Sequence, residues 1–378
     1  MNHALEGILV IELGTVLTAP LAGMMLADLG ARVIKVEHPS GGDPFRRHAG
    51  KLYSPHFASF NRNKESIQLD LQGEAGKADL LALLARADVL LENYRPGVMA
   101  RLGLTEEALK EINPRLVWCS ITGFGAEGPY RDRPCYDAVA LGLSGLASIM
   151  LDPAQPAMTG PTISDNVTGM YACYGILGAL MGRARTGNGA RVEVNMLEAS
   201  IAFSPEGFAQ YTRLGAVPGP QTRVAISQSH AFPCADGRLV AVHLSSVEKF
   251  WQAFVAVIER PDLLEDTRFL SPELRTRNYA LLNREAAHTF LSRTRDEWCE
   301  RLAQSDVPFS PVYSVPEVMD DPQVRQARTF YEIDHPEHGK MVGIHRPVTI
   351  DGARGPTTRP APLLGEHGAA IRTEFGLA

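Results

Sequence analysis

Residues 8–39 read ILVIELGTVLTAPLAGMMLADLGARVIKVEHP, and this stretch decides the fold class of the chain. It begins with a run over residues 8–13 that is apolar except for Glu12, which is typical of a strand buried on both faces. After a short loop, Pro20 suits the first turn of a helix, and the apolar positions continue to Gly30. Residues 31–39 then predict a second strand. The whole pattern predicts a βαβ unit, in which the two strands run parallel.

The same alternation continues through the first half of the chain. We expect a helix from about residue 74 to 87, a strand over 88–94 and a short helix over 105–113. Further strands are expected over residues 116–125 and 190–196, with a long apolar helix before the second of them. Strands that alternate with helices in this way predict an α/β fold with a parallel sheet.

Composition shifts divide the chain into parts. Residues 1–211 are expected to form the N-terminal part of a large domain. The Gly- and Pro-rich stretch at 212–224 has no periodicity and predicts a linker. Residues 225–310 predict a smaller α+β domain, with a hairpin around Asp236 and Gly237. Residues 311–378 are rich in proline, and we expect them to form a second linker and a return to the large domain.

Composition and charge exclude several classes of protein. The chain has 378 residues, 45% hydrophobic and 21% charged, with a net charge of −6 that argues against a nucleic-acid surface. Its five cysteines form no CxxC and the histidines show no metal-ligand spacing, so we expect no metal site and a cytoplasmic location. The N-terminus does not resemble a signal peptide, and the apolar stretch over residues 167–180 is too short to span a membrane.

The opening βαβ unit suggests a dinucleotide site, but its loop argues against one. The loop reads GTVLTAPLAG rather than GxGxxG, and Val16 and Leu17 place bulk where a pyrophosphate needs close backbone approach. The amides at the start of the following helix remain available to another ligand.

Asp165 stands at the head of the apolar segment SDNVTGMYACYGILGALMGRAR. Two interpretations are open on local grounds. The carboxylate can cap the helix by accepting from first-turn amides. It can also act as a nucleophile toward a thioester or another activated carbonyl, and the helix dipole then favours its ionised form.

Cations lie in separate segments of the predicted large domain. Lys64 precedes an alternating strand, and Arg95 and Arg101 surround a turn and a helix start. They are either solvated loop residues or ligands for the phosphates of an extended molecule. The glycines at 123, 125 and 128 follow a strand end, where open α/β sheets bind ligands.

Six segments in order resemble the class III coenzyme A transferases, a family that includes carnitine, bile-acid and formyl-CoA transferases and the related α-methylacyl-CoA racemases. They include GTVLTAPLAG, NRNK, ENYRPG, SITGFG, ISDNVTG and APLLGEHG and cover residues 9–46, 61–71, 89–104, 113–139, 163–199 and 361–368. The resemblance implies a Rossmann-like large domain, a small domain and an interlocked homodimer. It implies no tightly bound cofactor, because coenzyme A and acyl-CoA are substrates. From the charge and the short apolar stretch, we expect neither a nucleic acid nor a membrane as a partner.

The resemblance also implies the site residues. Asp165 corresponds to the nucleophile that forms an aspartyl anhydride and then an aspartyl-CoA thioester. The positions that correspond to CoA contacts in the family are Val16, Ala19, Asn63, Lys64, Asn93, Tyr94, Arg101 and Tyr136. Such chemistry requires exclusion of water and amide donors for each oxyanion.

At several positions the sequence differs from particular members of the family, and these differences reduce the number of expected substrates and reactions. Formyl-CoA transferases carry a glutamine at the position of Leu17 and a run of four glycines that this chain lacks between Gln221 and Trp251. Formyl-CoA and oxalate are therefore disfavoured as substrates. The racemases use a histidine at the position of Tyr136, and a tyrosine is a poor base at neutral pH. Racemisation of 2-methylacyl-CoA remains the alternative to CoA transfer.

Overall fold

The computed structural model describes residues 4–48, 52–245, 248–335, 337–354 and 358–378. The chain divides into two compact units, one formed by 1–147, 158–205 and 328–378 and the other by 148–157 and 206–327. Residues 212–224, which we predicted as a linker, include the end of helix α9 (Pro205–Leu214) and the start of helix α10 (Thr222–Ile226).

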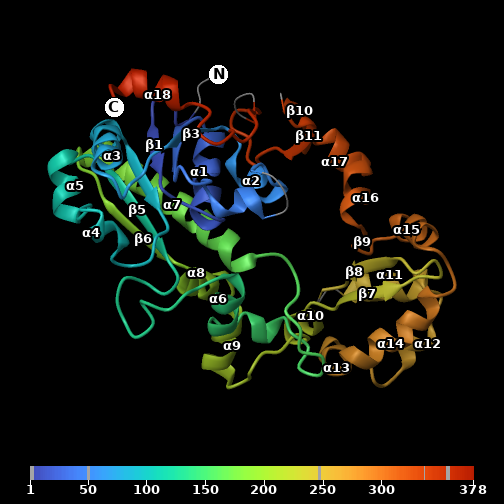
Figure 1. Ribbon diagram of the computed structural model, residues 1–378. Helices are drawn as coiled ribbons and strands as arrows, with labels where there is room; N and C mark the ends of the chain where they lie inside the picture. The colour runs from blue at the N-terminus through green and yellow to red at the C-terminus, as the bar shows by residue number, and fades with distance from the viewer. Residues whose placement is uncertain (1–3, 49–51, 246–247, 336, 355–357) are drawn as a thin grey trace. The chain divides into compact units, whose positions relative to one another are not determined.

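A six-stranded parallel sheet forms the centre of the first unit, which confirms the predicted α/β class (Figure 1). Its strands, in chain order, are β1 (Leu9–Glu12), β2 (Arg32–Glu37), β3 (Lys64–Gln68), β4 (Val89–Glu92), β5 (Val117–Thr122) and β6 (Arg191–Asn195). They lie in the order β3-β2-β1-β4-β5-β6, which is the order of the dinucleotide-binding sheet. The direction of winding therefore reverses between β1 and β4.

Helices cover both faces of this sheet, as the alternation of side chains along β1 shows. Val10 packs in one core with residues of α1 (Thr18–Asp28) and α7 (Ile163–Thr186). Ile11 packs in the opposite core with α3 (Glu74–Arg86), α5 (Glu106–Ile112) and α18 (Gly368–Phe375). Because both faces are buried, the strand is apolar except for Glu12, which is the pattern seen in residues 8–13.

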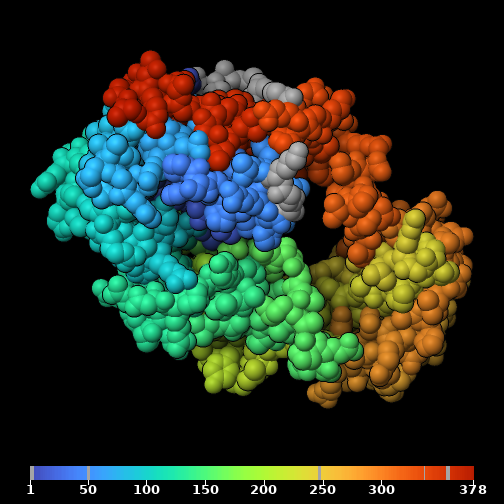
Figure 2. Space-filling model, in the orientation of Figure 1, coloured from blue at the N-terminus to red at the C-terminus, as the bar shows by residue number. Residues whose placement is uncertain are grey.

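The end of the chain lies on the first unit (Figure 2). Ile371 is fully buried in the second core, Arg372 forms an ion pair of 2.8 Å with Asp79, and the amide of His367 donates to the carbonyl of Ser66 at 3.0 Å. An antiparallel hairpin, β10 (Phe330–His335) and β11 (Gly339–Ile344), belongs to the same unit.

The second unit contains a three-stranded antiparallel sheet of β7 (Ser229–Pro233), β8 (Leu239–His243) and β9 (Phe309–Val312). The β7–β8 hairpin turns at Gly237, which has a φ of 74°. Aromatic side chains from β7, α11 (Glu248–Val257), α14 (Tyr279–Phe290) and α15 (Arg295–Ala303) fill its core. Its shorter helices are α12 (Asp262–Glu265), α13 (Pro272–Arg277), α16 (Val315–Asp320) and α17 (Pro322–Gln326).

Short elements complete the first unit: η1 (Pro44–Arg47), α2 (Pro55–Asn61), α4 (Val98–Arg101), α6 (Asp137–Leu143), η2 (Ala147–Ile149) and α8 (Met196–Phe203), with η2 ending in the segment assigned to the other unit. Among the described residues, no helix is long and apolar enough to cross a membrane. Those same residues contain no cluster of three or more His, Cys, Asp or Glu side chains that could hold a metal ion.

Candidate active site

A cavity of about 390 Å³ lies at the carboxyl edge of the parallel sheet. Residues that follow the ends of β1, β4, β5 and β6 contribute to its wall, and it includes the place where the winding reverses. Open α/β sheets bind their ligands at this place. The cavity is lined by Thr15, Val16, Leu17, Thr18, Asn93, Tyr94, Arg95, Pro96, Val98, Arg101, Ile121, Thr122, Gly123, Arg131, Arg133, Cys135, Tyr136, Asp165 and Met196.

The loop between β1 and α1, residues 14–18, forms one wall of the cavity and is held from two sides. Asn93 accepts from the amide of Thr15 at 3.0 Å and donates to the Thr15 carbonyl at 2.8 Å and to the Thr18 hydroxyl at 3.0 Å. On the other side, the carboxylate of Asp43 accepts from the amide of Val16 at 3.1 and 3.2 Å. Val16 has a φ of 68°, a left-handed conformation that is costly for a β-branched residue.

Asp165 is the third residue of α7, so it does not occupy the capping position that the sequence allowed. Thr162 precedes the helix, and its side chain makes no capping hydrogen bond. Asp137 from α6 supplies the missing acceptor, because its carboxylate accepts from the amide of Asp165 at 3.1 Å. Among the described residues we find no hydrogen bond to the Asp165 carboxylate, which lines the cavity. The side chain is therefore available for chemistry.

Burial raises the pKa of Asp165 to about 6, and the like charge of Asp137 raises it further in the same direction. We expected the helix dipole to favour the ionised carboxylate; the larger effect on its pKa is the loss of water around it. At pH 7 to 8 a group with this pKa is still mostly ionised. A carboxylate that is poorly solvated and charged is a better nucleophile than one in water.

The neighbouring thiol does not compete as a nucleophile. Cys135 also lines the cavity, but burial, followed by the charges of Asp165 and Asp137, raises its pKa to about 11. The thiol therefore stays protonated at neutral pH.

Five of the eight predicted CoA contacts lie around this cavity together with Asp165: Val16, Asn93, Tyr94, Arg101 and Tyr136. Tyr136 is 68% exposed and precedes α6, so its ring lies at the rim. Asn93 is engaged with the loop through both ends of its amide, which leaves it little capacity for a ligand.

The other three predicted contacts stay predictions, because none of them lines the cavity. Ala19 is fully buried in the core below α1. Asn63 is also buried, where it accepts from the amide of Arg359 at 2.7 Å and donates to Asp28 at 2.9 Å. These contacts place Asn63 in the packing of the first unit.

Lys64 is the first residue of β3 rather than part of a preceding loop, and its side chain points into the protein. Its ammonium group is 2.8 Å from Glu12 Oε2 and donates to the Pro20 carbonyl and to Asn61, each at 2.8 Å. The residue is only 1% exposed. Because its donors are already satisfied, Lys64 is not placed to meet a phosphate group.

Sequence reasoning missed two cations and two carboxylates. Arg131 and Arg133 line the cavity beside Arg95 and Arg101, and the Arg133 guanidinium lies 3.9 Å from the Tyr130 ring centroid. The signal was the RDR triplet in the Gly-rich segment after β5. The roles of Asp137 and Asp43 left no such signal, because both act on backbone amides distant in sequence.

The two helices that carry the loop and Asp165 cross closely, and a glycine permits the approach. A Cβ atom on Gly169 of α7 would lie 2.8 Å from the carbonyl oxygen of Thr18 in α1. No side chain larger than hydrogen fits at this crossing without displacing a helix. The separation between the loop and the carboxylate is thus fixed by backbone contact.

Comparisons with known proteins agree over nearly the whole chain. The model of CoA-transferase family III matches residues 5–368. The chain is 34% identical to the acetyl-CoA:oxalate CoA-transferase of Acetobacter aceti over 98% of this chain and 95% of that one. It is 32% identical to the human succinyl-CoA:glutarate CoA-transferase over 98% and 85%. A solved CaiB/BaiF family protein from Brucella suis is similar in fold, with a TM-score of 0.88, 32% identity and coverage of 99% and 100%.

Proposed function

Because the chain belongs to CoA-transferase family III, we propose that it moves coenzyme A from an acyl-CoA donor to a carboxylic acid with Asp165 as the nucleophile. The observation that carries the proposal is the position of the Asp165 carboxylate. It lines the cavity at the sheet's switch point without a hydrogen-bond partner among the described residues, and four arginines line the same cavity.

The reaction proceeds by acyl transfer to and from Asp165. The carboxylate attacks the donor thioester, the carbon–sulfur bond breaks, and CoA leaves as a thiolate from a mixed anhydride. The thiolate attacks the aspartyl carbonyl, releases the donor acid and forms an aspartyl-CoA thioester. The acceptor carboxylate displaces CoA again, and the thiolate then takes the acceptor acyl group and regenerates Asp165. No water enters any step, so exclusion of water from the cavity protects the intermediates.

The arginines support two binding roles. Arg101 and Arg95 follow β4, and Arg131 and Arg133 follow β5, so cations reach the cavity from two adjacent strands. Guanidinium groups bind phosphates and carboxylates through paired hydrogen bonds. We assign Arg101 to the phosphates of CoA. We assign Arg131 and Arg133 to the distal carboxylate of a dicarboxylic acceptor, in keeping with the glutarate that one relative's name contains.

Trapping the covalent intermediate tests the nucleophile. Wild type is incubated with acyl-CoA and hydroxylamine, and peptides are mapped by mass spectrometry. We expect an aspartyl hydroxamate at Asp165, none in Asp165→Ala, and an unchanged adduct position in Asp137→Asn, the matched neighbouring carboxylate. Full transfer activity in Asp165→Ala would refute the proposal.

An acceptor screen tests the substrate class. Succinate and glutarate are compared with monocarboxylic acids of the same chain length, using wild type and Arg133→Gln. We expect wild type to favour the dicarboxylic acids and the variant to lose that preference. Equal rates with both acid classes would contradict the assignment of the distal carboxylate. The comparisons do not favour the racemase alternative, which predicts exchange of the α-proton without any acceptor.

We also propose that the protein forms a homodimer. Helix α7 presents Met170, Tyr174 and Met181 on one exposed face, and Phe203 of α8 and Leu143 of α6 are exposed as well. Large apolar side chains gathered in this way mark an interaction surface. Light scattering during size-exclusion chromatography is expected to give twice the mass of the chain, and Tyr174→Lys to reduce it. A monomer at micromolar concentration would contradict this proposal.

A further inference from the structure

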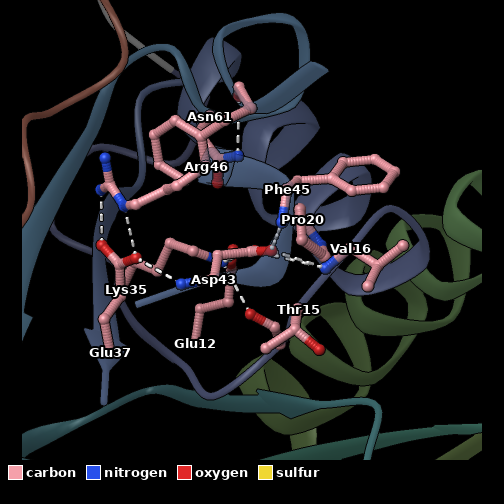
Figure 3. A network of polar contacts seen from close by, with 12 residues as sticks. Glu12, Thr15, Val16, Pro20, Lys35, Glu37, Asp43, Phe45, Arg46 and Asn61 are labelled. Carbon is pink, nitrogen blue, oxygen red and sulfur yellow. Dashed lines mark hydrogen bonds and ion pairs between the residues drawn. The ribbon is translucent and has the colours of Figure 1, made fainter. Parts of the chain in front are cut away.

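A chain of buried charges runs from the sheet to the cavity loop (Figure 3). Lys35 of β2 lies 2.9 Å from Glu12 of β1 and 3.0 Å from Asp43, and it donates to the Gly14 carbonyl at 2.7 Å. The three side chains have no exposed surface. The three donors of the ammonium group thus meet two carboxylates and one carbonyl, which satisfies it fully.

Asp43 extends this chain to the loop backbone. One carboxylate oxygen faces Lys35, and the carboxylate also accepts from the amides of Val16 and Phe45. The bond to Phe45 caps the short helix η1, so Asp43 has an ordinary structural role as well. The bond to Val16 is different, because it holds a β-branched residue at a φ of 68°. Such residues leave that region of backbone space unless the surroundings hold them there.

The held residue belongs to the wall of the cavity. Val16, Leu17 and Thr18 line it together with Asp165, whereas Asp43 and Lys35 do not. We propose that Asp43, held in turn by Lys35, is a positioning residue that keeps the loop at residues 14–18 in the conformation required for CoA transfer. The inference rests on the proposed function, since it assumes that the cavity beside Asp165 is where the reaction occurs.

The test is a double-mutant cycle on activity. Asp43→Asn keeps the size of the side chain but removes its charge, and Val16→Gly removes the cost of the left-handed conformation, which glycine adopts freely. We expect Asp43→Asn to lower kcat about tenfold in the wild-type background. In the Val16→Gly background, the same change is expected to lower kcat about twofold. KM for the donor should change less than kcat in both backgrounds.

A merely structural role predicts a different result. If Asp43 only stabilised the fold, Asp43→Asn would lower the melting temperature but would not change kcat per folded molecule, whether residue 16 is valine or glycine. This outcome would overturn the inference. Asp79→Asn is the matched control, because Asp79 is also buried, pairs with an arginine at 2.8 Å and accepts from a backbone amide at 3.0 Å. It should lose stability but not kcat.

Two further variants keep the result unambiguous. If Asp43→Asn does not fold, the cycle is run with Asp43→Glu. This variant keeps a charge beside Lys35 but displaces the acceptor for the Val16 amide. An equal loss of kcat with valine and with glycine at position 16 would again overturn the inference. Asp165→Ala separates the two proposals. Activity in Asp165→Ala removes the proposed function, whereas its inactivity together with additive effects at Asp43 and Val16 removes only the positioning role.

Discussion

Replacing Asp165 by asparagine is expected to stabilise the folded protein while it abolishes transfer. In the folded state, burial and then Asp137 raise the pKa of Asp165 from 3.8 to about 6. The folded protein therefore holds this proton more tightly than the unfolded chain, and ionisation at higher pH weakens the fold. A difference of this size corresponds to about 3 kcal/mol, and partial contact with solvent reduces it to about 1–3 kcal/mol. Asparagine has the same shape and carries no charge, so it avoids this cost.

The gain in stability from Asp165→Asn should depend on pH, and this dependence tests the reasoning. The gain from Asp165→Asn should be complete above the folded pKa of about 6, fall to roughly half at pH 5 and vanish below the unfolded pKa of 3.8. Urea unfolding of wild type and variant at pH 8 and pH 5 measures it. Asp152→Asn, at an exposed aspartate, controls for the loss of one surface charge. A variant no more stable than wild type at pH 8, or a gain equal at both pH values, would refute the reasoning.

Three further predictions concern other charged side chains of the first unit. Asp137→Asn should move the acidic limb of the kcat–pH profile, near pH 6, to lower pH, because it removes a like charge beside Asp165. A shift of this limb to higher pH would contradict the prediction. Lys64→Met should destabilise the protein by about 3 kcal/mol in urea, because it removes one of the cations beside the buried Glu12, yet leave CoA affinity by calorimetry unchanged. Arg101→Gln should weaken CoA binding about tenfold, and the loss of affinity should be smaller at high salt. Arg115→Gln, which lies outside the cavity, should leave CoA binding unchanged.

Local patterns were sufficient to predict the sheet and the edge at which the candidate site lies. The apolar runs around Val10 and Leu90 determine strands covered on both faces, and the loops at their carboxyl ends must then meet at one edge. Asp165 became the candidate nucleophile because its segment resembles a known family. Its pKa was not foreseeable, because the burial that raises it comes from residues distant in sequence.

The sequence placed Lys64 before β3, and this was wrong for a simple physical reason. A lysine beside Asn61 and Asn63 has the composition of a solvated loop, and only the pairing of β3 with β2 shows that it begins a strand, opposite Val33. Its buried partner Glu12 lies 52 positions earlier in an otherwise apolar strand. Local composition does not report an ion pair between two strands, so the sequence alone could not separate a structural lysine from a phosphate ligand.

The crossing at Gly169 has a consequence for protein engineering. The loop at residues 14–18 leads into α1, and Asp165 belongs to α7. These two helices are in backbone contact, so the spacing between the loop and Asp165 is insensitive to changes in the surrounding side chains. The arginines of the Gly-rich segment after β5 come from a connection that makes no part of this crossing. Libraries aimed at new acceptor acids should therefore randomise residues 124–136 and leave the glycine untouched. Acceptor range and the reaction centre would then vary independently, an arrangement that favours rapid divergence of specificity.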